Sequence, residues 1–404
     1  MNKKYLPSAL ILYLNYFIHG VGCSILGQAV IKEALAASWG VEVMAITAIS
    51  AALGLGRLIA LPFAGPLSDK LGRRISTAIG SGSYAIYLIG LALAFNAGTN
   101  GGYQIAYICA IVGGIANSFL DTGIYPAVSE IIYKAPGVAT MGIKFFISVS
   151  QMLLPFVLGV TVSTTATGAT SYNTLFYACG IVYLVLLVLV MIFPLPDTDQ
   201  KAAGKKEGLI DSLKHTHFSV ESIAMILIGF TCTGTFQLWL NCAQNFAKEN
   251  VGWADPSIMQ TYYSAGTMLA LVVTALLTRK IKDVRFILGY PVICLVTMIA
   301  VLVGKSQTLM IAGAFLIGWA GAGGLLQIAT SVCNMLFPKI KGTVTALVMI
   351  ASSLCNYTIL TAASKMQPSQ VMVMNIVLTA VGVLLGLFVN LRYTKMVEQA
   401  QADN

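Results

Sequence analysis

Residues 65–74 read GPLSDKLGRR, a short charged segment between two long apolar runs. The runs on either side cover roughly residues 41–64 and 75–95. Each is long enough to cross a bilayer as a helix, which takes about 20 residues. The segment is therefore predicted to be a tight loop at the membrane surface, between two transmembrane helices.

The same alternation of apolar runs and polar loops continues along the whole chain. Of its 404 residues, 57% are hydrophobic and 10% are charged, whereas a soluble domain carries about 25% charged residues. Long apolar blocks, rather than short alternating segments, exclude a β-barrel. The sequence predicts an all-α membrane protein with twelve transmembrane helices, at roughly 6–31, 41–64, 75–95, 103–131, 139–165, 172–194, 219–247, 257–279, 285–303, 307–333, 342–365 and 370–391.

The distribution of basic residues predicts the orientation. With both termini in the cytoplasm, 20 of the 24 lysines and arginines lie on or near the inner side, counting Arg57 and Lys144 at inner helix ends. The other four are Lys32, Lys248, Lys305 and Lys365. This is the positive-inside asymmetry of a multi-pass membrane protein whose two termini lie in the cytoplasm. The net charge of +9 follows from topology, so the expected surroundings are a lipid bilayer and not nucleic acid.

Cysteines and histidines give no sign of a metal or cofactor. The eight cysteines lie within predicted spans and form no C-x-x-C pair, which indicates buried thiols rather than disulfides. His215 and His217 lie in a polar stretch, where a solvated loop is expected and a metal-binding pair is the alternative. The apolar N-terminal run continues past any signal-peptide length without a convincing cleavage site, so an uncleaved first helix is predicted.

The chain divides into two similar halves. The longest polar interval predicts a cytoplasmic central loop at residues 195–218, between a first bundle at 1–194 and a second at 219–404. The fourth span ends in YKAPGVATMG and the tenth in FPKIKGTVTA, which align Gly137 with Gly342. Two pseudo-symmetric six-helix bundles are the architecture expected of one large transporter class.

The loop at 65–74 resembles the signature of the major facilitator superfamily, G-x-x-x-D-[RK]-x-G-[RK]-[RK]. The matching residues are Gly65, Asp69, Lys70, Gly72, Arg73 and Arg74. The resemblance implies that this loop is a conformational switch, which latches the two halves on the cytoplasmic side during alternating access. Glycines permit a tight turn there, and charged residues form charge-assisted hydrogen bonds. The alternative for the basic residues is topology alone, which does not explain Asp69.

Three further stretches resemble the YdiM/YdiN type of bacterial inner-membrane transport proteins. They are NYFIHG at 15–20, ANSFLDTGIYPAVSE at 116–130 and AGGLLQI at 322–328. The resemblance implies a small cyclic or aromatic acid, similar to shikimate or quinate, as the substrate. The fifth span lacks the G-x-x-x-G-P-x-x-G-G pattern of drug–proton antiporters, which disfavours multidrug export.

The family resemblance also implies that spans one, four, seven and ten line a central cavity. Each carries polar or aromatic residues about one helical turn apart, which places them on a common face. The candidate substrate-binding residues are Asn15, His19, Asn117, Asp121, Gln237, Asn241, Trp319 and Gln327. The alternative is that the buried amides join helices to one another and bind no substrate.

Asp121 is the only carboxylate expected near the middle of the membrane. It lies ten residues from the inner end of its span, or about 15 Å, where a charge costs roughly 2.5–3.5 kcal/mol. Three interpretations remain open: a proton-coupling site, an ion pair with Lys144, or a contact with a cationic group of the substrate. His19 is the second candidate for proton coupling, since imidazole titrates near neutral pH.

The predicted function is secondary active transport of a small organic molecule, with proton-coupled uptake as the favoured mode. The transporter is expected to be a monomer. No G-x-x-x-x-G-K-[ST] loop and no catalytic constellation are present, so neither ATP-driven transport nor an enzyme is expected. The alternatives are proton-driven efflux of a metabolite or drug, and a non-transporting sensor built on the same fold.

Overall fold

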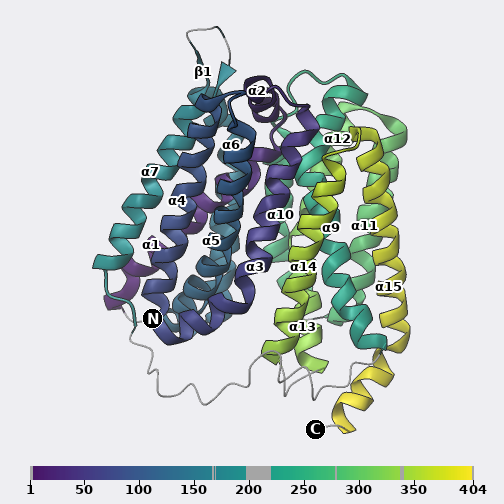
Figure 1. Ribbon diagram of the computed structural model, residues 1–404. Coiled ribbons are helices and arrows are strands. Elements are labelled where there is room, and N and C mark those ends of the chain that lie inside the picture. Colours follow the sequence, from purple (N-terminus) through teal and green to yellow (C-terminus); the bar gives the residue numbers. More distant parts are fainter. Residues whose placement is uncertain are drawn as a thin grey trace. The chain divides into compact units, whose positions relative to one another are not determined.

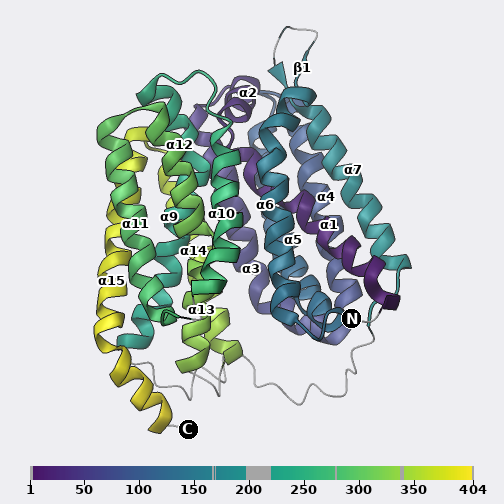
Figure 2. The same ribbon diagram turned by 180° about the vertical axis from the view of Figure 1, so that it is seen from behind.

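The computed structural model describes residues 3–165, 168, 170–196, 220–277, 280–336 and 341–402. The chain forms two compact units, Met1–Lys205 and Lys206–Asn404, each with its own apolar core. Within each unit, long helices run side by side (Figures 1 and 2). A helix satisfies its own backbone hydrogen bonds, which is what a segment surrounded by lipid requires.

The elements of the first unit are η1 Lys3–Tyr5, α1 Leu6–Ser24, η2 Ile25–Gly27, α2 Ala29–Trp39, η3 Val43–Ile46, α3 Thr47–Leu71, α4 Arg73–Ala97, α5 Gly102–Ile131, α6 Pro136–Thr161, β1 Ser163–Thr164, β2 Thr170–Ser171 and α7 Asn173–Ile192. The two short strands pair antiparallel, with Ser163 opposite Ser171. The second unit contains α9 Val220–Val251, α10 Met259–Leu277, α11 Asp283–Gly304, α12 Gln307–Leu316, the π-helical segment η5 Ile317–Ala322, α13 Leu325–Leu336, α14 Lys341–Ala363 and α15 Pro368–Ala402.

The predicted all-α membrane fold is confirmed. Among the described residues, eleven helical segments are long and apolar enough to span a bilayer. The remaining predicted span, 257–279, corresponds to α10, whose first turns carry the polar residues Gln260 and Thr261. From residue 197 the central loop lies outside the described residues, as do His215 and His217, so the boundaries at 194 and 219 stay predictions.

Two predicted spans are interrupted in the structure. The first ends as a regular helix at Ser24, and Gln28 adopts an extended conformation before α2 begins. The short helix α2 buries Lys32, whose Nζ donates a hydrogen bond to Thr47 Oγ1 over 2.8 Å. The tenth span divides into α12, η5 and α13, with a break at residues 323–324.

The second span is longer than predicted. Helix α3 passes through Pro62 and Pro66 and ends only at Leu71. Gly65 therefore lies inside the helix rather than in a turn, contrary to the expectation from sequence. The turn is made by Gly72 alone, whose φ of 93° is open to glycine and strained for other residues.

In the first unit, α3 and α5 cross in backbone contact. A Cβ atom placed on Gly56 would collide with the carbonyl of Ile111, and one placed on Gly114 would collide with the carbonyl of Leu53. The two collisions are reciprocal, and each helix contributes positions three residues apart. Small residues at such crossings let helix backbones approach closely in lipid.

The second unit repeats this crossing between α10 and the α12–η5 segment. A Cβ atom on Gly266 would meet the carbonyl of Phe315, and one on Gly318 would meet the carbonyl of Tyr263. The spacing is again three residues on each helix. The equivalence supports the internal repeat that the sequence predicts.

Replacing Gly114 by alanine is expected to destabilise the first unit by about 1–3 kcal/mol, because the added methyl group overpacks a backbone contact. Thermal unfolding in detergent, followed with a thiol-reactive dye, measures the loss, since six of the eight free cysteines are buried. Gly159→Ala on α6 is the matched control, since its Cβ meets no atom within 4 Å. Equal melting temperatures for the two variants would contradict the close-packing argument.

Candidate functional site

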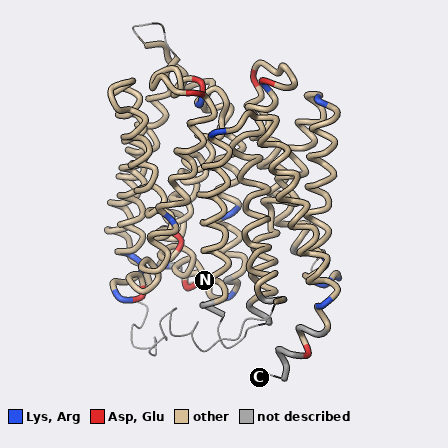
Figure 3. The backbone as a smooth tube through the Cα atoms, turned by 45° about the vertical axis from the view of Figure 1, so that its right-hand side comes forward, with Lys and Arg blue, Asp and Glu red and all other residues tan. Residues whose placement is uncertain are grey.

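Most described charged residues lie toward the ends of helices, and few lie midway along them (Figure 3). Two of those few form an ion pair in the first unit. Arg57 Nη2 on α3 lies 2.8 Å from Asp121 Oδ2 on α5. A cation at this distance offsets much of the cost of placing a carboxylate in a membrane.

The second oxygen of Asp121 is also bonded. Oδ1 accepts a short hydrogen bond from the hydroxyl of Tyr16 on α1, and the Tyr16 side chain is almost fully buried. The carboxylate therefore joins α1, α3 and α5. The ion pair is only partly buried, because the side chains of Arg57 and Asp121 are 29% and 30% exposed.

A second polar contact lies about one helical turn away. His19 Nε2 on α1 is 2.8 Å from Asn117 Oδ1 on α5, so two of the predicted binding residues meet. His19 follows Tyr16 by three residues, and Asn117 precedes Asp121 by four, so both pairs join the same two helices. The Nδ1 atom of His19 is buried without a hydrogen-bond partner in the described part of the chain.

We refer to Tyr16, His19, Arg57, Asn117 and Asp121 as the Asp121 site. With Nε2–H donating to the Asn117 oxygen, Nδ1 of the neutral imidazole is left as an acceptor. The site thus combines a carboxylate, a guanidinium, a phenol, an amide and an imidazole. Such a set can bind a small polar solute and can hold a proton.

Asn15, predicted to bind substrate, has its hydrogen bonds supplied inside the first unit. Its Oδ1 accepts from Ser81 Oγ over 2.7 Å, and its Nδ2 donates to the carbonyl of Ile11 over 2.9 Å. Its own carbonyl accepts from the Tyr183 hydroxyl over 2.8 Å. Asn15 is fully buried. These contacts are those of a residue that joins α1 to α4 and α7.

The remaining candidate binding residues belong to the second unit. On α9, Asn241 Nδ2 donates to Gln237 Oε1 over 3.1 Å. Trp319 lies in η5, with its ring centroid 6.2 Å from that of Tyr290. Gln327 on α13 is exposed. Their role in binding stays a prediction.

Lys144 was expected to be the nearest cation to Asp121, but the residue that pairs with Asp121 is Arg57. Arg57 was placed at an inner helix end because the sequence predicted that the span ends at residue 64. Since α3 continues to Leu71, Arg57 lies fourteen residues from that end, or about 21 Å. Lys144 on α6 is partly buried and lies within electrostatic range of both partners.

One feature of the sequence could have identified Arg57 as a site residue: it is a charged residue within the apolar run AALGLGRLIALPFAG. A proline in a helix usually ends or kinks it, yet α3 continues through Pro62 and Pro66 to Leu71. Tyr16 carried no separate signal, because a tyrosine in an apolar helix is common. Its role follows only from where α1 packs against α5.

The loop at 65–74 forms a charge network at the predicted cytoplasmic end of the first unit. Arg73 Nη1 donates to Asp69 Oδ1 over 2.8 Å and to Ser68 Oγ over 3.0 Å. Arg73 Nε also lies 3.9 Å from Glu130 Oε1 on α5. Arg74 donates to the carbonyl of Phe193 over 3.2 Å. The loop therefore ties α3, α4, α5 and the end of α7 together.

Lys70 and Gly65 contribute differently from the other loop residues. Lys70 is exposed, and a Cβ atom on Gly65 would meet nothing within 4 Å. Their part in a conformational switch stays a prediction.

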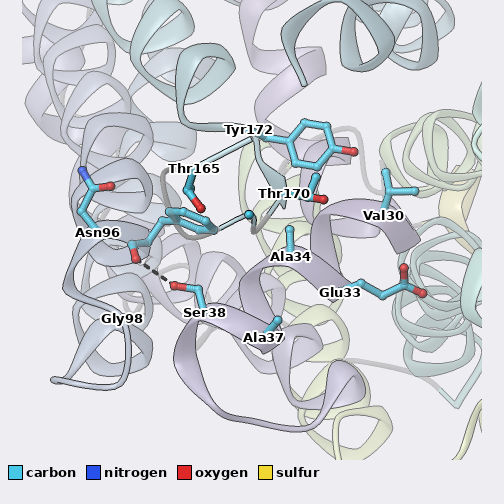
Figure 4. A pocket seen from close by; sticks show the side chains of 12 residues that line it. Val30, Glu33, Ala34, Ala37, Ser38, Asn96, Gly98, Thr165, Thr170 and Tyr172 are labelled. Atoms are coloured by element: carbon cyan, nitrogen blue, oxygen red, sulfur yellow. Dashed lines mark hydrogen bonds between the residues drawn. The ribbon is translucent and has the colours of Figure 1, made fainter. Parts of the chain in front are cut away.

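A pocket also lies elsewhere in the first unit (Figure 4). It has a volume of about 840 Å³ and is lined by α2, the end of α4 and the segment around β1 and β2. Glu33 is its only charged lining residue, and positions 166, 167 and 169 beside it lie outside the described residues. It contains none of the residues of the Asp121 site.

The Arg57–Asp121 pair is expected to show strong coupling in a double-mutant cycle. Arg57→Gln and Asp121→Asn should each cost about 1–3 kcal/mol, less than a sealed pair because both side chains are partly exposed. The double variant should lose much less than the sum of the two, as measured by melting temperature in detergent. Asp69→Asn with Arg73→Gln is the comparison pair, whose side chains are 34% and 18% exposed at the predicted cytoplasmic end. Its expected coupling is about 1 kcal/mol, because Arg73 also bonds Ser68 and lies near Glu130. Additive losses at Arg57 and Asp121 would show that the two charges do not interact.

Gly72→Ala is expected to destabilise the loop by about 1–3 kcal/mol, because its φ of 93° and ψ of 157° are essentially restricted to glycine. The Cβ itself meets no atom within 4 Å, so the cost arises from the backbone conformation. Gly65→Ala is the control, since helical alanine is favoured over glycine by roughly 0.5–1 kcal/mol. A melting temperature for Gly72→Ala at or above that of Gly65→Ala would refute the strain at this turn.

Comparison with known proteins agrees with this geometry. Residues 12–357 match the profile of the Major Facilitator Superfamily. The chain is 32% identical over 364 residues to an uncharacterized MFS-type transporter, YfkL, of Bacillus subtilis, covering 88% of each chain. It is 30% identical over 402 residues to the inner membrane transport protein YdiM of Escherichia coli, covering 98% of this chain and 96% of YdiM.

Solved structures show the same fold. The xylose transporter XylE from E. coli, in an inward open conformation, aligns with a TM-score of 0.73 and 17% sequence identity, covering 95% of each chain. At this identity the likeness concerns the fold alone. Together with the profile match over most of the chain, these comparisons show that the protein belongs to the major facilitator superfamily and is a multi-pass membrane transporter, not an enzyme.

Proposed function

We propose that this transporter takes up a small organic acid together with protons, with both termini in the cytoplasm of a bacterial cell. The observation that supports this most is the Asp121 carboxylate, held between Tyr16 and Arg57 midway along the first unit's helices. In our proposal this carboxylate alternates between an ionised form beside the guanidinium and a neutral form that carries a proton. That choice is what a proton-coupled transporter requires.

The neighbouring residues suit a small polar solute better than an inorganic ion. His19, Asn117 and Tyr16 supply an imidazole, an amide and a phenol, which are hydrogen-bonding groups rather than a cage of charged oxygens. In the second unit, Gln237, Asn241 and Trp319 carry amides and an aromatic ring, and their role in binding stays a prediction from the sequence. A cyclic or aromatic acid, similar to shikimate or quinate, is the substrate class that we propose.

The charge network of the 65–74 loop favours a transporter over a sensor. A receptor that only binds its ligand needs no switch at the cytoplasmic face. In this chain Asp69, Arg73 and Glu130 are linked there, at the junction of three helices. In our proposal these contacts open and close as the two halves alternate in access.

The coupling role of Asp121 can be tested in proteoliposomes with an acidic exterior and a panel of radiolabelled carboxylic acids. The wild type is expected to accumulate at least one acid when the gradient is present. Asp121→Asn should reduce gradient-driven accumulation to the level of protein-free liposomes, while exchange of labelled for unlabelled acid continues.

Asp255→Asn, which removes an exposed carboxylate from a loop, is the matched control and should transport as the wild type does. If Asp121→Asn accumulates acid at the normal rate, Asp121 is not the coupling residue. Preloading the liposomes with acid under the same gradient tests proton-driven export, which would appear as loss of the acid into the acidic exterior.

A further inference from the structure

We propose that Arg57 is the group that binds the carboxylate of the substrate, and that Asp121 occupies this place until a proton neutralises it. One proton on Asp121 then accompanies each acid anion. The inference rests on the proposed function, which does not itself say what holds the acid or how many protons are needed.

The first support is the chemistry of the pair. A guanidinium carries N–H donors in a planar fork that matches any carboxylate, whether from a side chain or from a ligand. In the structure Asp121 Oδ2 lies 2.8 Å from Arg57 Nη2. Asp121 thus makes the contact that an incoming acid would need, so the acid and the ionised Asp121 compete.

The second support is the helix face on which the Arg57 and Asp121 side chains are exposed. Ile108 on α5 and Ile59 on α3 are exposed apolar side chains, as expected for a surface that faces lipid. At 3.6 residues per turn, Asp121 points about 140° away from Ile108, and Arg57 about 160° away from Ile59. The exposed parts of the pair therefore lie on the faces of α5 and α3 opposite these apolar side chains.

The third support is charge balance. Without substrate, the Asp121 site holds one guanidinium and one carboxylate. With an acid anion bound and a proton on Asp121, it again holds one of each. The charge of the pair is therefore the same before loading and after the anion and the proton have both bound, which avoids the cost of an unpaired charge in the loaded state.

Other ionisable groups surround Asp121, and none supplies an alternative place for the carboxylate in the contacts of the described residues. Tyr16 and His19 face it from α1, Tyr125 from α5 itself and Lys144 from α6. Helix α4 contributes hydroxyl groups, with Arg73 and Glu130 meeting at its far end. Lys144 is the one other cation nearby, so the experiment includes it.

The position of the second polar contact narrows the class of acid. Asn117 lies one turn along α5 from Asp121, or about 6 Å, and is bonded to His19 of α1. Consider an acid whose carboxylate binds Arg57. A hydroxyl group on the opposite side of its ring would then lie beside Asn117 and His19. A hydroxylated cyclic monocarboxylate meets this requirement.

Chemical rescue tests the binding role of Arg57 without knowledge of the natural substrate. Asp121→Ala leaves Arg57 beside an empty space that fits acetate. Sodium acetate should raise the melting temperature of this variant in detergent well above the effects of acetamide and of sodium chloride at matched concentration. Adding Arg57→Gln should abolish the stabilisation, whereas adding Lys144→Gln should leave it. Asp121→Ser provides a second variant with the same expected behaviour if Asp121→Ala does not fold.

The pH dependence tests the coupling. Acetate binding by the wild type should strengthen about tenfold for each unit that the pH falls, because one proton must bind with each anion. The dependence should level off once Asp121 is protonated. In Asp121→Ala, acetate binding should not change between pH 8 and about pH 6, where acetate itself stays ionised.

Two results would overturn the inference: acetate stabilisation that survives Arg57→Gln or requires Lys144, and wild-type binding that does not depend on pH. Either can occur in a protein that accumulates acids under a proton gradient, in which case the proposed function would stand. Conversely, acetate rescue through Arg57 without any gradient-driven accumulation would leave the carboxylate site in place and refute proton-coupled uptake.

Discussion

A carboxylate at membrane depth is costly unless it is paired or neutral, and Asp121 meets this requirement through contacts that join three helices of the first unit. Its two oxygens bind Tyr16 of α1 and Arg57 of α3, so three helices converge on one side chain. The two side chains of the pair stay 29% and 30% exposed. Exposed ion pairs contribute less to stability than buried pairs lose when one partner is removed, so this pair should be less costly to break than a buried one.

The close crossing of α3 and α5 is what brings the pair together. Because Gly56 and Gly114 have no side chains, the two backbones meet one residue before Arg57 and seven before Asp121. The second unit has the same crossing at Gly266 and Gly318, but the residue after Gly266 is Thr267, which bonds the Gly318 carbonyl over 3.1 Å. The two units therefore share the same helix crossing. The residue after the crossing glycine is charged in the first unit and is a threonine in the second.

A short chain of contacts connects the Asp121 site with the loop at 65–74. The carbonyl of Thr122, the residue after Asp121, accepts a hydrogen bond from Ser68 Oγ over 2.9 Å. Ser68 in turn accepts one from Arg73 over 3.0 Å, and Arg73 pairs with Asp69. A change at Asp121 that shifts α5 against α3 thus acts directly on the residues of the loop. The contacts give a physical route by which loading of the site and the cytoplasmic switch can influence each other.

The amino-acid sequence by itself determined the membrane class, the positions of the spans, the loop at 65–74 and the choice of Asp121 as the unusual residue. These follow from properties that a linear pattern carries: apolar length, charge and the spacing of glycines. Only the tertiary structure decided that Arg57 and not Lys144 pairs with Asp121, that Tyr16 completes the contact, and that Asn15 is held inside the bundle. The reason is that α3 continues through Pro62 and Pro66, which places Arg57 deep in the membrane. How far a helix extends past a proline depends on what packs around it, and no local pattern contains that information.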